Sequence, residues 1–285
     1  MKKYFRIQMI SMALFSSYFL LANKEPQRIV SCSLAGDEIL LTLLPTKEKR
    51  KKIIALSKLA DSPLYSNVKE EAKDISLRSE TQIEHLISLK PDLVIAASYN
   101  QGEFLHRLKS LKINTHVMEG FNNLNNLRSH IKNIAKLIGE EERGEKILKE
   151  MSEKMSLQNK KKKKTKIMLV LPDKTVLGQE TLIDDVLTQA GYVNIAHDLK
   201  VLGWQKVSDE KMLSFLSSKE GDIDFILTSA EEKERSLILE SFSKYIPFSR
   251  IKNLSHKIIL IPPSIYSSFS SSILELFKFI DRGEA

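Results

Sequence analysis

Short, mainly apolar runs separated by segments of helical length are the dominant feature of this 285-residue sequence. In its first half the runs lie at residues 28–33, 53–56, 93–97 and 115–118. In its second half they lie at residues 167–171, 223–227 and 257–261. Strands that are apolar on both faces are typical of a parallel sheet covered by helices on both sides. The pattern therefore predicts an α/β fold with two units, each built on a parallel sheet.

The segments between the apolar runs carry helical patterns. In the first unit, we expect helices at residues 38–44, 82–89 and 103–111. In the second unit, we expect them at residues 182–190, 208–216 and 272–280. Because strands and helices alternate, the order favours parallel strands that are connected through helices.

A helix-rich stretch from residue 124 to residue 157 separates the two units. Gly139 divides this stretch, as is typical of a residue that follows a helix C-terminus. A helix from Glu140 to Leu157 would be about 27 Å long, enough to reach from one lobe to another. The predicted domains are an N-terminal lobe at residues 23–138, a connecting helix with a lysine-rich linker at 139–164, and a C-terminal lobe at 165–285.

The formal charge of +8 comes from two short regions. Lys2, Lys3 and Arg6 supply +3 near the N-terminus, and six lysines between residues 160 and 166 supply +6. The rest of the chain is left with a charge of −1, so no nucleic-acid partner is expected. We interpret the lysine run as a solvated helix end and linker.

The N-terminus has the composition of a secretory signal. Its basic residues precede an apolar stretch from Met9 to Ala22, which has 14 residues. This stretch is short of the roughly 20 residues that cross a bilayer as a helix. We therefore predict a signal peptide at residues 1–22 and export to the periplasm, with an uncleaved membrane anchor as the alternative.

Cys32 is the only cysteine, which excludes an intramolecular disulfide and any site made of several cysteines. The segment Ile29–Cys32 loosely resembles the motif of a lipidated cysteine. Charged residues between Lys24 and Arg28 separate this segment from the apolar stretch, however. We therefore expect Cys32 to be a buried strand residue and not a lipid anchor.

Motifs of catalysis are missing from the sequence. It contains no glycine-rich dinucleotide motif, no P-loop and no nucleophile elbow. Its six histidines are scattered without the spacing of a local metal site, although residues distant in sequence can share a metal. We therefore expect a protein that is not an enzyme, with no catalytic residues, no resident metal and no cofactor.

Four segments resemble the periplasmic substrate-binding proteins of ABC importers for iron complexes and cobalamin. Arg28–Leu40 is similar to the opening strand, turn and helix of that family. Gln82–Ile95 contains Leu-Lys-Pro-Asp-Leu-Val, which is similar to its most distinctive stretch. Gly178–Gly191 and Gly203–Glu210 resemble its glycine-to-helix segment and its Trp-x-x-Val-Ser-x-Glu motif. The segments occur in the family's order, and the similarity covers nearly all of residues 28–282.

The resemblance implies two Rossmann-like lobes joined by a single long α-helix, with a ligand cleft between them and modest closure on binding. It implies a periplasmic monomer that captures an iron–siderophore or a related metal chelate, such as haem or cobalamin. This protein would deliver the chelate to the membrane permease of an ABC importer. Glu84 and Glu210 match the family glutamates that dock the two lobes on the permease.

Ligand contacts are expected after strand carboxyl ends, where open α/β sheets bind ligands. The predicted ligand-binding residues are Ser33, Leu34, Arg78, Tyr99, Trp204 and Tyr266. Arg78 would suit an anionic group, with a solvated loop arginine as the alternative. Packing within a lobe is the alternative role of Trp204. Several positions that are aromatic in cobalamin binders of the family hold Leu59, Ser62 or Arg78 here, which counts against cobalamin.

Three other functions stay open at this point. The first is a protein of the same transporter class that binds a bare divalent metal through residues such as His116 and His197. The second is a chelatase-like enzyme on the same two-lobed plan, with Cys32 or a histidine in the cleft and a strongly perturbed pKa. The third is a relative that serves as a sensor or accessory domain.

Overall fold

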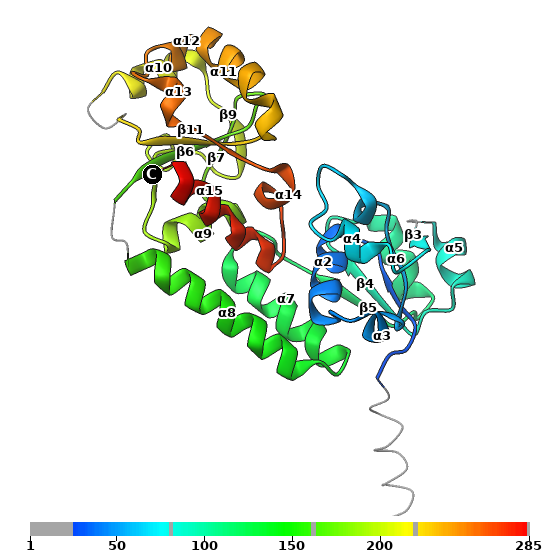
Figure 1. The fold of residues 1–285 in the computed structure, drawn as a ribbon. Coiled ribbons are helices and arrows are strands. Elements are labelled where there is room, and N and C mark those ends of the chain that lie inside the picture. The colour runs from blue at the N-terminus through cyan, green and yellow to red at the C-terminus, as the bar shows by residue number, and fades with distance from the viewer. Residues whose placement is uncertain (1–24, 80–81, 161–163, 219–221, 284–285) are drawn as a thin grey trace, which may run out of the picture.

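The computed structural model describes residues 25–79, 82–160, 164–218 and 222–283. Two lobes, each built on its own β-sheet, lie side by side, and helices near the middle of the chain run along both of them (Figure 1). The two-lobed α/β fold predicted from the apolar runs is therefore confirmed.

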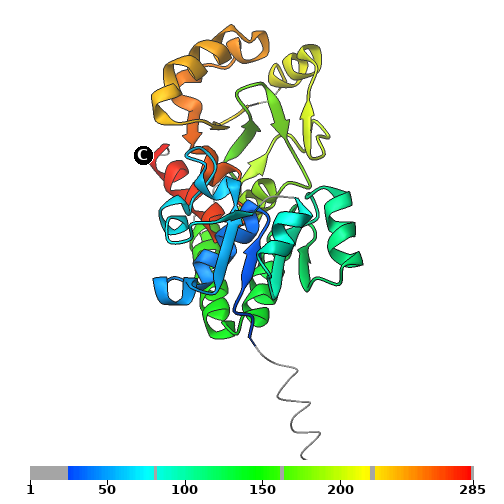
Figure 2. The ribbon, with the colours of Figure 1, turned by 90° about the vertical axis from the view of Figure 1, so that its right-hand side faces the viewer.

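The N-terminal lobe contains a five-stranded sheet in the order β3-β2-β1-β4-β5, and every pair in it is parallel (Figure 2). Its strands are β1 Ile29–Ser31, β2 Ile53–Ser57, β3 Arg78–Ser79, β4 Leu93–Ala97 and β5 Thr115–Met118. Its helices are α2 Leu34–Leu43, α3 Lys47–Arg50, η1 Lys58–Asp61, α4 Lys69–Ala72, α5 Ile83–Ser88 and α6 Gly102–Ser110. Strand β4 is buried along its whole length, as its uniformly apolar sequence predicts.

Helix α2 begins four residues earlier than the apolar pattern predicts. Ser33 is its N-cap, because the Ser33 hydroxyl accepts a hydrogen bond from the backbone N–H of Gly36 at 3.2 Å. Asp37, which was expected before the helix, consequently lies inside it next to Glu38.

The C-terminal lobe contains a sheet in the order β11-β10-β6-β7-β9, with β8 also paired to β6. Its strands are β6 Lys166–Val170, β7 Thr175–Leu177, β8 Val193–Asn194, β9 Trp204–Lys206, β10 Phe225–Ser229 and β11 Ile258–Ile261. Its helices are α9 Leu182–Gln189, α10 Asp209–Leu216, η2 Glu232–Glu234, α11 Arg235–Lys244, α12 Ile246–Ser249, α13 Leu254–Lys257, α14 Pro263–Tyr266, η3 Ser271–Glu275 and α15 Leu276–Gly283.

The sheet of this second lobe is parallel between β11, β10, β6 and β8, as predicted, but not throughout. Strand β7 is antiparallel to both β6 and β9. Only four residues, Leu171–Lys174, separate β6 from β7, and Lys174 takes the left-handed conformation with φ of 70°. A connection this short makes a hairpin, because a parallel crossover needs a dozen residues or more.

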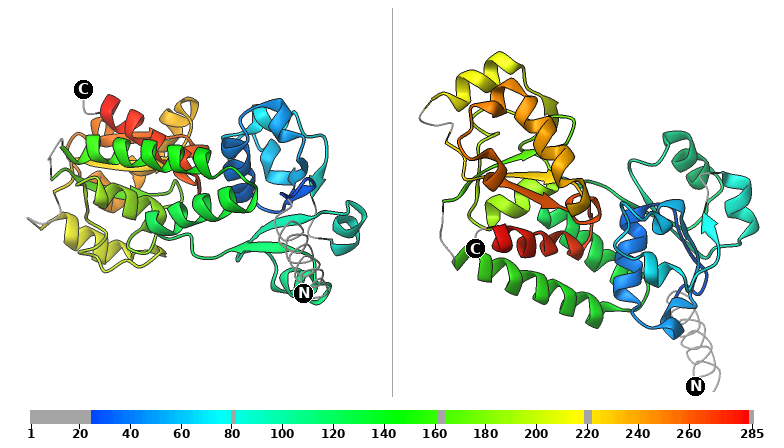
Figure 3. Two further views of the ribbon diagram at one scale, coloured as in Figure 1. Left: turned by 90° about the horizontal axis from the view of Figure 1, so that it is seen from below. Right: turned by 45° about the horizontal axis from the view of Figure 1, so that its top comes forward.

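Helices α7 Leu124–Leu137 and α8 Glu141–Lys160 pack against each other and connect the lobes (Figure 3). Gly139 separates them with φ of +72°, as its predicted place after a helix end requires. The start of α7 already lies at the second lobe, where the backbone N–H of Leu124 donates to the Asp185 carboxylate of α9 at 2.7 Å. Helix α8, which was expected to connect the lobes by itself, therefore packs along a second helix, α7.

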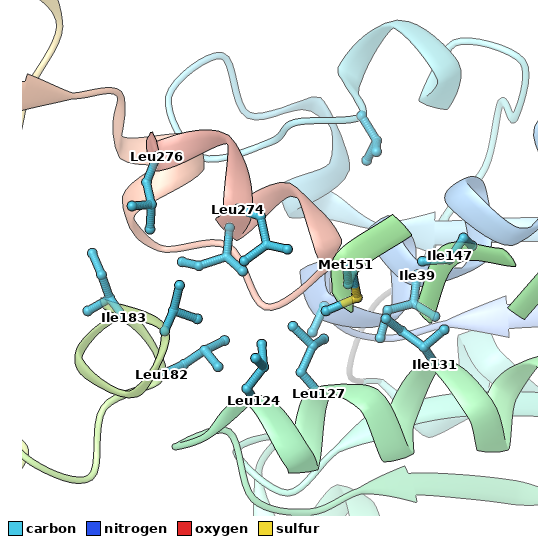
Figure 4. Packing of buried hydrophobic residues seen from close by; sticks show 14 of the residues in the cluster. Ile39, Leu124, Leu127, Ile131, Ile147, Met151, Leu182, Ile183, Leu274 and Leu276 are labelled. Carbon is cyan, nitrogen blue, oxygen red and sulfur yellow. The ribbon is translucent and has the colours of Figure 1, made fainter. Parts of the chain in front are cut away.

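One hydrophobic cluster extends through both lobes. It includes Ile39 of α2, Ile131 of α7, Met151 of α8 and Leu274 of η3, and Figure 4 shows these side chains gathered between the helices. Because a rigid-body reorientation of the lobes would expose part of this shared core, the packing favours small movements.

The predicted signal peptide, residues 1–22, lies outside the described residues. Within the described ranges, no helix has both the length and the apolar character needed to cross a membrane. Cys32 is a buried residue directly after β1, as predicted, and burial raises the pKa of its thiol to about 12.

Candidate ligand site between the lobes

Loops at the carboxyl ends of the two sheets meet through aromatic side chains. Tyr99 follows β4 and Phe121 follows β5, whereas Phe269 follows β11 and α14 in the other lobe. The ring centroids of Tyr99 and Phe121 are 5.0 Å apart, and those of Phe121 and Phe269 are 5.2 Å apart. Because this edge is where open α/β sheets bind ligands, it is the candidate site.

The segment 264–272, here called the serine segment, holds the lobes together through Glu38. Ser268 donates its hydroxyl to one carboxylate oxygen of Glu38 at 2.8 Å, and Asn67 donates its amide to the other at 3.0 Å. Asn67 also donates to the backbone carbonyl of Ser264 at 2.6 Å. The Glu38 carboxylate of the first lobe therefore depends on the second lobe for its hydrogen bond from Ser268.

Glu38 is only 1% exposed, and no described lysine, arginine or histidine forms an ion pair with it. Burial raises the pKa of Glu38 to about 7, and the hydrogen bond from Ser268 opposes this increase. Asp37 beside it is fully buried and accepts hydrogen bonds from the hydroxyl and the backbone N–H of Ser57. Burial raises the pKa of Asp37 to about 6 despite these bonds.

Tyr99 is close enough to these two acids for their charges to act on its phenol. Its ring is 52% exposed, while its phenol lies beside Ser33 and the backbone of Ala35. Burial of the phenol raises the pKa of Tyr99, and the negative charges of Asp37 and Glu38 raise it further. The residue thus presents a neutral phenol and one face of its ring at the edge of the first lobe.

The other predicted ligand-binding residues differ in how exposed their side chains are. Ser33 is buried and occupied by the cap of α2, and Leu34 is the partly exposed first residue of that helix. Trp204 lies in β9 and is 53% exposed. Tyr266 faces the core, because its side chain in α14 packs into the shared cluster and is only 2% exposed. Tyr99 and Trp204 therefore provide the accessible aromatic surface among the predicted residues.

Arg78 is neither free nor in a solvated loop. It lies in β3, and its guanidinium makes a bidentate ion pair with Asp61, with Nε 2.6 Å from one carboxylate oxygen. The same guanidinium donates to the carbonyl oxygens of Ala72, Ile75 and Leu77. Arg78 thereby fastens the segment between β2 and β3 to the edge of the sheet.

That segment presents apolar side chains near the meeting point of the lobes. Leu59, Leu64 and Tyr65 are exposed, and Tyr65 is two residues from Asn67, which contacts the serine segment. Exposed apolar groups near the contact between two lobes suit an organic ligand.

The two predicted docking acids lie one on each lobe. Glu84 is in the first turn of α5 and forms an ion pair with Arg107 of α6 at 2.8 Å. Backbone hydrogen bonding at the helix start lowers the pKa of Glu84, and Arg107 lowers it further. Glu210 is exposed in the first turn of α10, which Ser208 caps.

His116 and His197, named above for the alternative metal site, lie on different lobes and have different contacts. His197 contacts the carboxylate of Asp184 at 2.8 Å, whereas His116 is in β5 with a buried Nε2 that has no partner. Burial lowers the pKa of His116, and nearby His130 lowers it further. Within the described ranges, no three histidine, cysteine or acidic side chains group as metal ligands would.

Sequence reasoning missed the residues that join the lobes at the site. Phe121, Phe269 and Asn67 lie in loops without a motif, and no motif marks the serine segment either. Ser270 does cap η3, but its neighbour Ser268 bonds Glu38. The one usable signal was the pair Asp37-Glu38 inside an otherwise apolar helix, where a buried acid needs partners.

Comparison with known proteins identifies the family of this chain. A family model described as periplasmic binding protein matches residues 29–252. The uncharacterized ABC transporter substrate-binding lipoprotein YvrC of Bacillus subtilis (strain 168) is 24% identical over 223 residues, which are 74% of this chain and 68% of that protein.

Solved structures share the fold over nearly the whole chain. A possible iron-binding (periplasmic solute-binding) protein of Staphylococcus epidermidis has a TM-score of 0.72 at 21% identity, covering 92% of this chain and 99% of its own. The periplasmic haem binding protein HutB of Vibrio cholerae has a TM-score of 0.72 at 18% identity, covering 90% of this chain and 98% of its own.

Two lobes joined by helices, with a candidate site where their sheet edges meet, define a solute-binding protein. The chain belongs to the periplasmic binding protein family, since that model matches most of its length. Members of this family are substrate-binding transport proteins, so the family implies a small-molecule ligand and the membrane permease of an ABC transporter as partners.

Proposed function

We propose that this protein captures a metal chelate between its lobes and delivers it to the permease of an ABC importer. The chelate is an iron–siderophore or a related complex such as haem or cobalamin. In this proposal residues 23–138 and 165–285 are the two ligand-holding lobes, and residues 139–164 connect them. The protein is exported as a monomer by a signal peptide at residues 1–22.

Exposed apolar surface at the site is the observation that carries this proposal. Tyr99 presents a ring face beside Phe121, and Leu64 and Tyr65 lie near the contact between the lobes. Such surface suits the organic framework of a chelate, whereas a bare divalent ion needs several converging polar ligands. Relatives of the same fold described as haem-binding or iron-binding support the same class of ligand.

Docking through Glu84 and Glu210 is the second part of the proposal. The two carboxylates are exposed on separate lobes, so one permease surface with two basic pockets would fix the orientation of the whole protein. Charges of this kind determine orientation and the rate of encounter more than affinity.

Fluorescence of Trp204 provides the test, because it is the only tryptophan in the chain. Residues 24–285 are purified without ligand and titrated separately with ferric siderophores, haem, cobalamin and divalent metal ions. We expect saturable quenching by at least one chelate, with a rise in melting temperature. Saturation by a divalent ion alone would favour the metal-binding alternative. No change with any compound would contradict the proposal and favour the sensor or enzyme alternatives.

A further inference from the structure

Three cationic side chains near the two sheet edges, Arg78, Lys174 and Lys206, are engaged by the chain's own groups. Arg78 is held by Asp61 and by three backbone carbonyls. In the second lobe, Lys206 contacts both the carboxylate and the carbonyl oxygen of Asp173. Lys174 donates to the hydroxyl of Ser241 and lies 5.6 Å from the ring centroid of Phe242.

Acidic groups at the first edge, by contrast, include two that are buried, and the charge of Arg78 lowers the pKa of only one of them, Asp37. Asp37 and Glu38 are both buried, and no described cation forms an ion pair with either. Charges in such surroundings are screened far less than charges in water. Glu119, exposed directly after β5, adds a further negative charge at this edge.

We propose that the interlobe site selects a metal chelate that is uncharged or positively charged over a polyanionic one. This inference rests on the proposed function and specifies the class of its ligand. A polyanion loses its hydration on entering the site and needs free donors such as arginine in return. Here Arg78, Lys174 and Lys206 are committed to the chain's own groups, while the ionised forms of Asp37 and Glu38 repel negative charge.

Ferric chelates of different charge can test this selectivity. Three hydroxamate groups balance the charge of a ferric ion, so such a chelate is uncharged, or singly positive when it carries a free ammonium. Three catecholate groups leave the complex with three negative charges. The probes are a linear ferric trihydroxamate with a free amine, the same compound with the amine acetylated, and a ferric tris-catecholate.

Calorimetric titration of the full mature chain with each probe gives the affinity and its dependence on salt. We expect the two hydroxamate complexes to bind at least about tenfold more tightly than the tris-catecholate, with the positively charged one weakened by added salt. A tris-catecholate that binds equally well or better would overturn the charge selectivity and leave the proposed function intact. Failure of every probe, together with haem and cobalamin, would refute the proposed function itself.

A variant of Asp61 tests the reason for this selectivity. Asp61→Asn removes the charge that engages Arg78, so we expect tris-catecholate binding to strengthen by roughly three- to tenfold. Glu240→Gln is the matched control, since Glu240 pairs with Lys244 on α11 and lies away from the sheet edges. If Asp61→Asn changes the affinity no more than the control does, commitment of Arg78 is not the cause of the selectivity.

Discussion

The two lobes have similar architecture but contribute different chemistry to the site between them. The N-terminal lobe contributes titratable groups, namely the buried pair Asp37-Glu38 and the ion pair of Arg78 with Asp61. The C-terminal lobe contributes neutral groups, namely the hydroxyls of the serine segment and the ring of Phe269. The buried acids at the contact between the lobes therefore belong to one lobe, and some of their hydrogen-bond partners belong to the other.

The largest effect is expected from the charge of Glu38. Its pKa is raised from 4.5 to about 7, so folding favours the protonated form. The associated stability is fully present below about pH 4.5 and is lost as the pH rises through 7. The loss is on the order of 3 kcal/mol, and Asp37, with its pKa raised to about 6, adds to it. Denaturant unfolding between pH 5 and pH 8 measures this decline.

Glu38→Gln sharpens this prediction, because it removes the charge and keeps the shape. We expect the variant to lose much of the dependence on pH and to be more stable than the wild type at pH 8. Ser268→Ala is the matched change in the other lobe and should weaken stability by roughly 1 kcal/mol at either pH. A wild-type protein whose stability rises from pH 5 to pH 8 would contradict this account of the buried pair.

Phe269→Ala removes the ring that the second lobe places against Tyr99 and Phe121. The ring is partly buried, so we expect a loss of about 2 kcal/mol in the free energy of unfolding. Leu237→Ala is the control, since that side chain is exposed on α11 and should change stability by less than about 0.5 kcal/mol. Equal effects of the two changes would show that the aromatic contact does not hold the lobes together.

Arg78→Ala should release the segment between β2 and β3. The expected loss of stability is about 1–2 kcal/mol, because several hydrogen bonds end on one side chain that is 19% exposed. Limited proteolysis between Lys58 and Lys73 should become faster. Arg107→Ala removes an exposed ion pair and serves as the comparison, with no increase in cleavage of this segment. Unchanged proteolysis in Arg78→Ala would mean that the segment is held by other contacts.

Reversal of both docking acids, Glu84→Lys with Glu210→Lys, should have the smallest effect on folding. Both side chains are exposed, so stability should change by no more than about 1 kcal/mol and ligand affinity should be unchanged. Uptake through the permease should nevertheless fall sharply, as measured with radiolabelled chelate in cells. Normal uptake by the double variant would remove Glu84 and Glu210 from the docking surface.

Much of the fold could be predicted from local pattern. Strands β1, β2, β4, β5 and β6 lie where apolar runs stand in the sequence, and α8 follows Gly139 as expected. Periodicity works for these elements because burial on both faces demands apolar residues. It failed for β7 and β9, which are three residues each and depend on a hairpin and on sheet pairing rather than on their own composition.

The site was harder to predict because it depends on contacts between distant segments. Asn67 and Ser264 are 197 residues apart, and Glu38 and Ser268 are 230 apart. Arg78 could be recognised as a residue near the edge, but not as the partner of Asp61, because the path of the chain between them decides that pairing. Tyr99 and Trp204 were predicted from their places after strands or in a motif, and both are exposed.

The central claim is that a chelate binds between the lobes against Tyr99. Calorimetric titration of a ferric trihydroxamate into the wild type and Tyr99→Ala tests it most directly. We predict saturable binding of one chelate per chain in the wild type and an affinity at least about tenfold lower in the variant, because an exposed ring face is lost. Equal affinity in the two proteins would place the ligand elsewhere and contradict the claim.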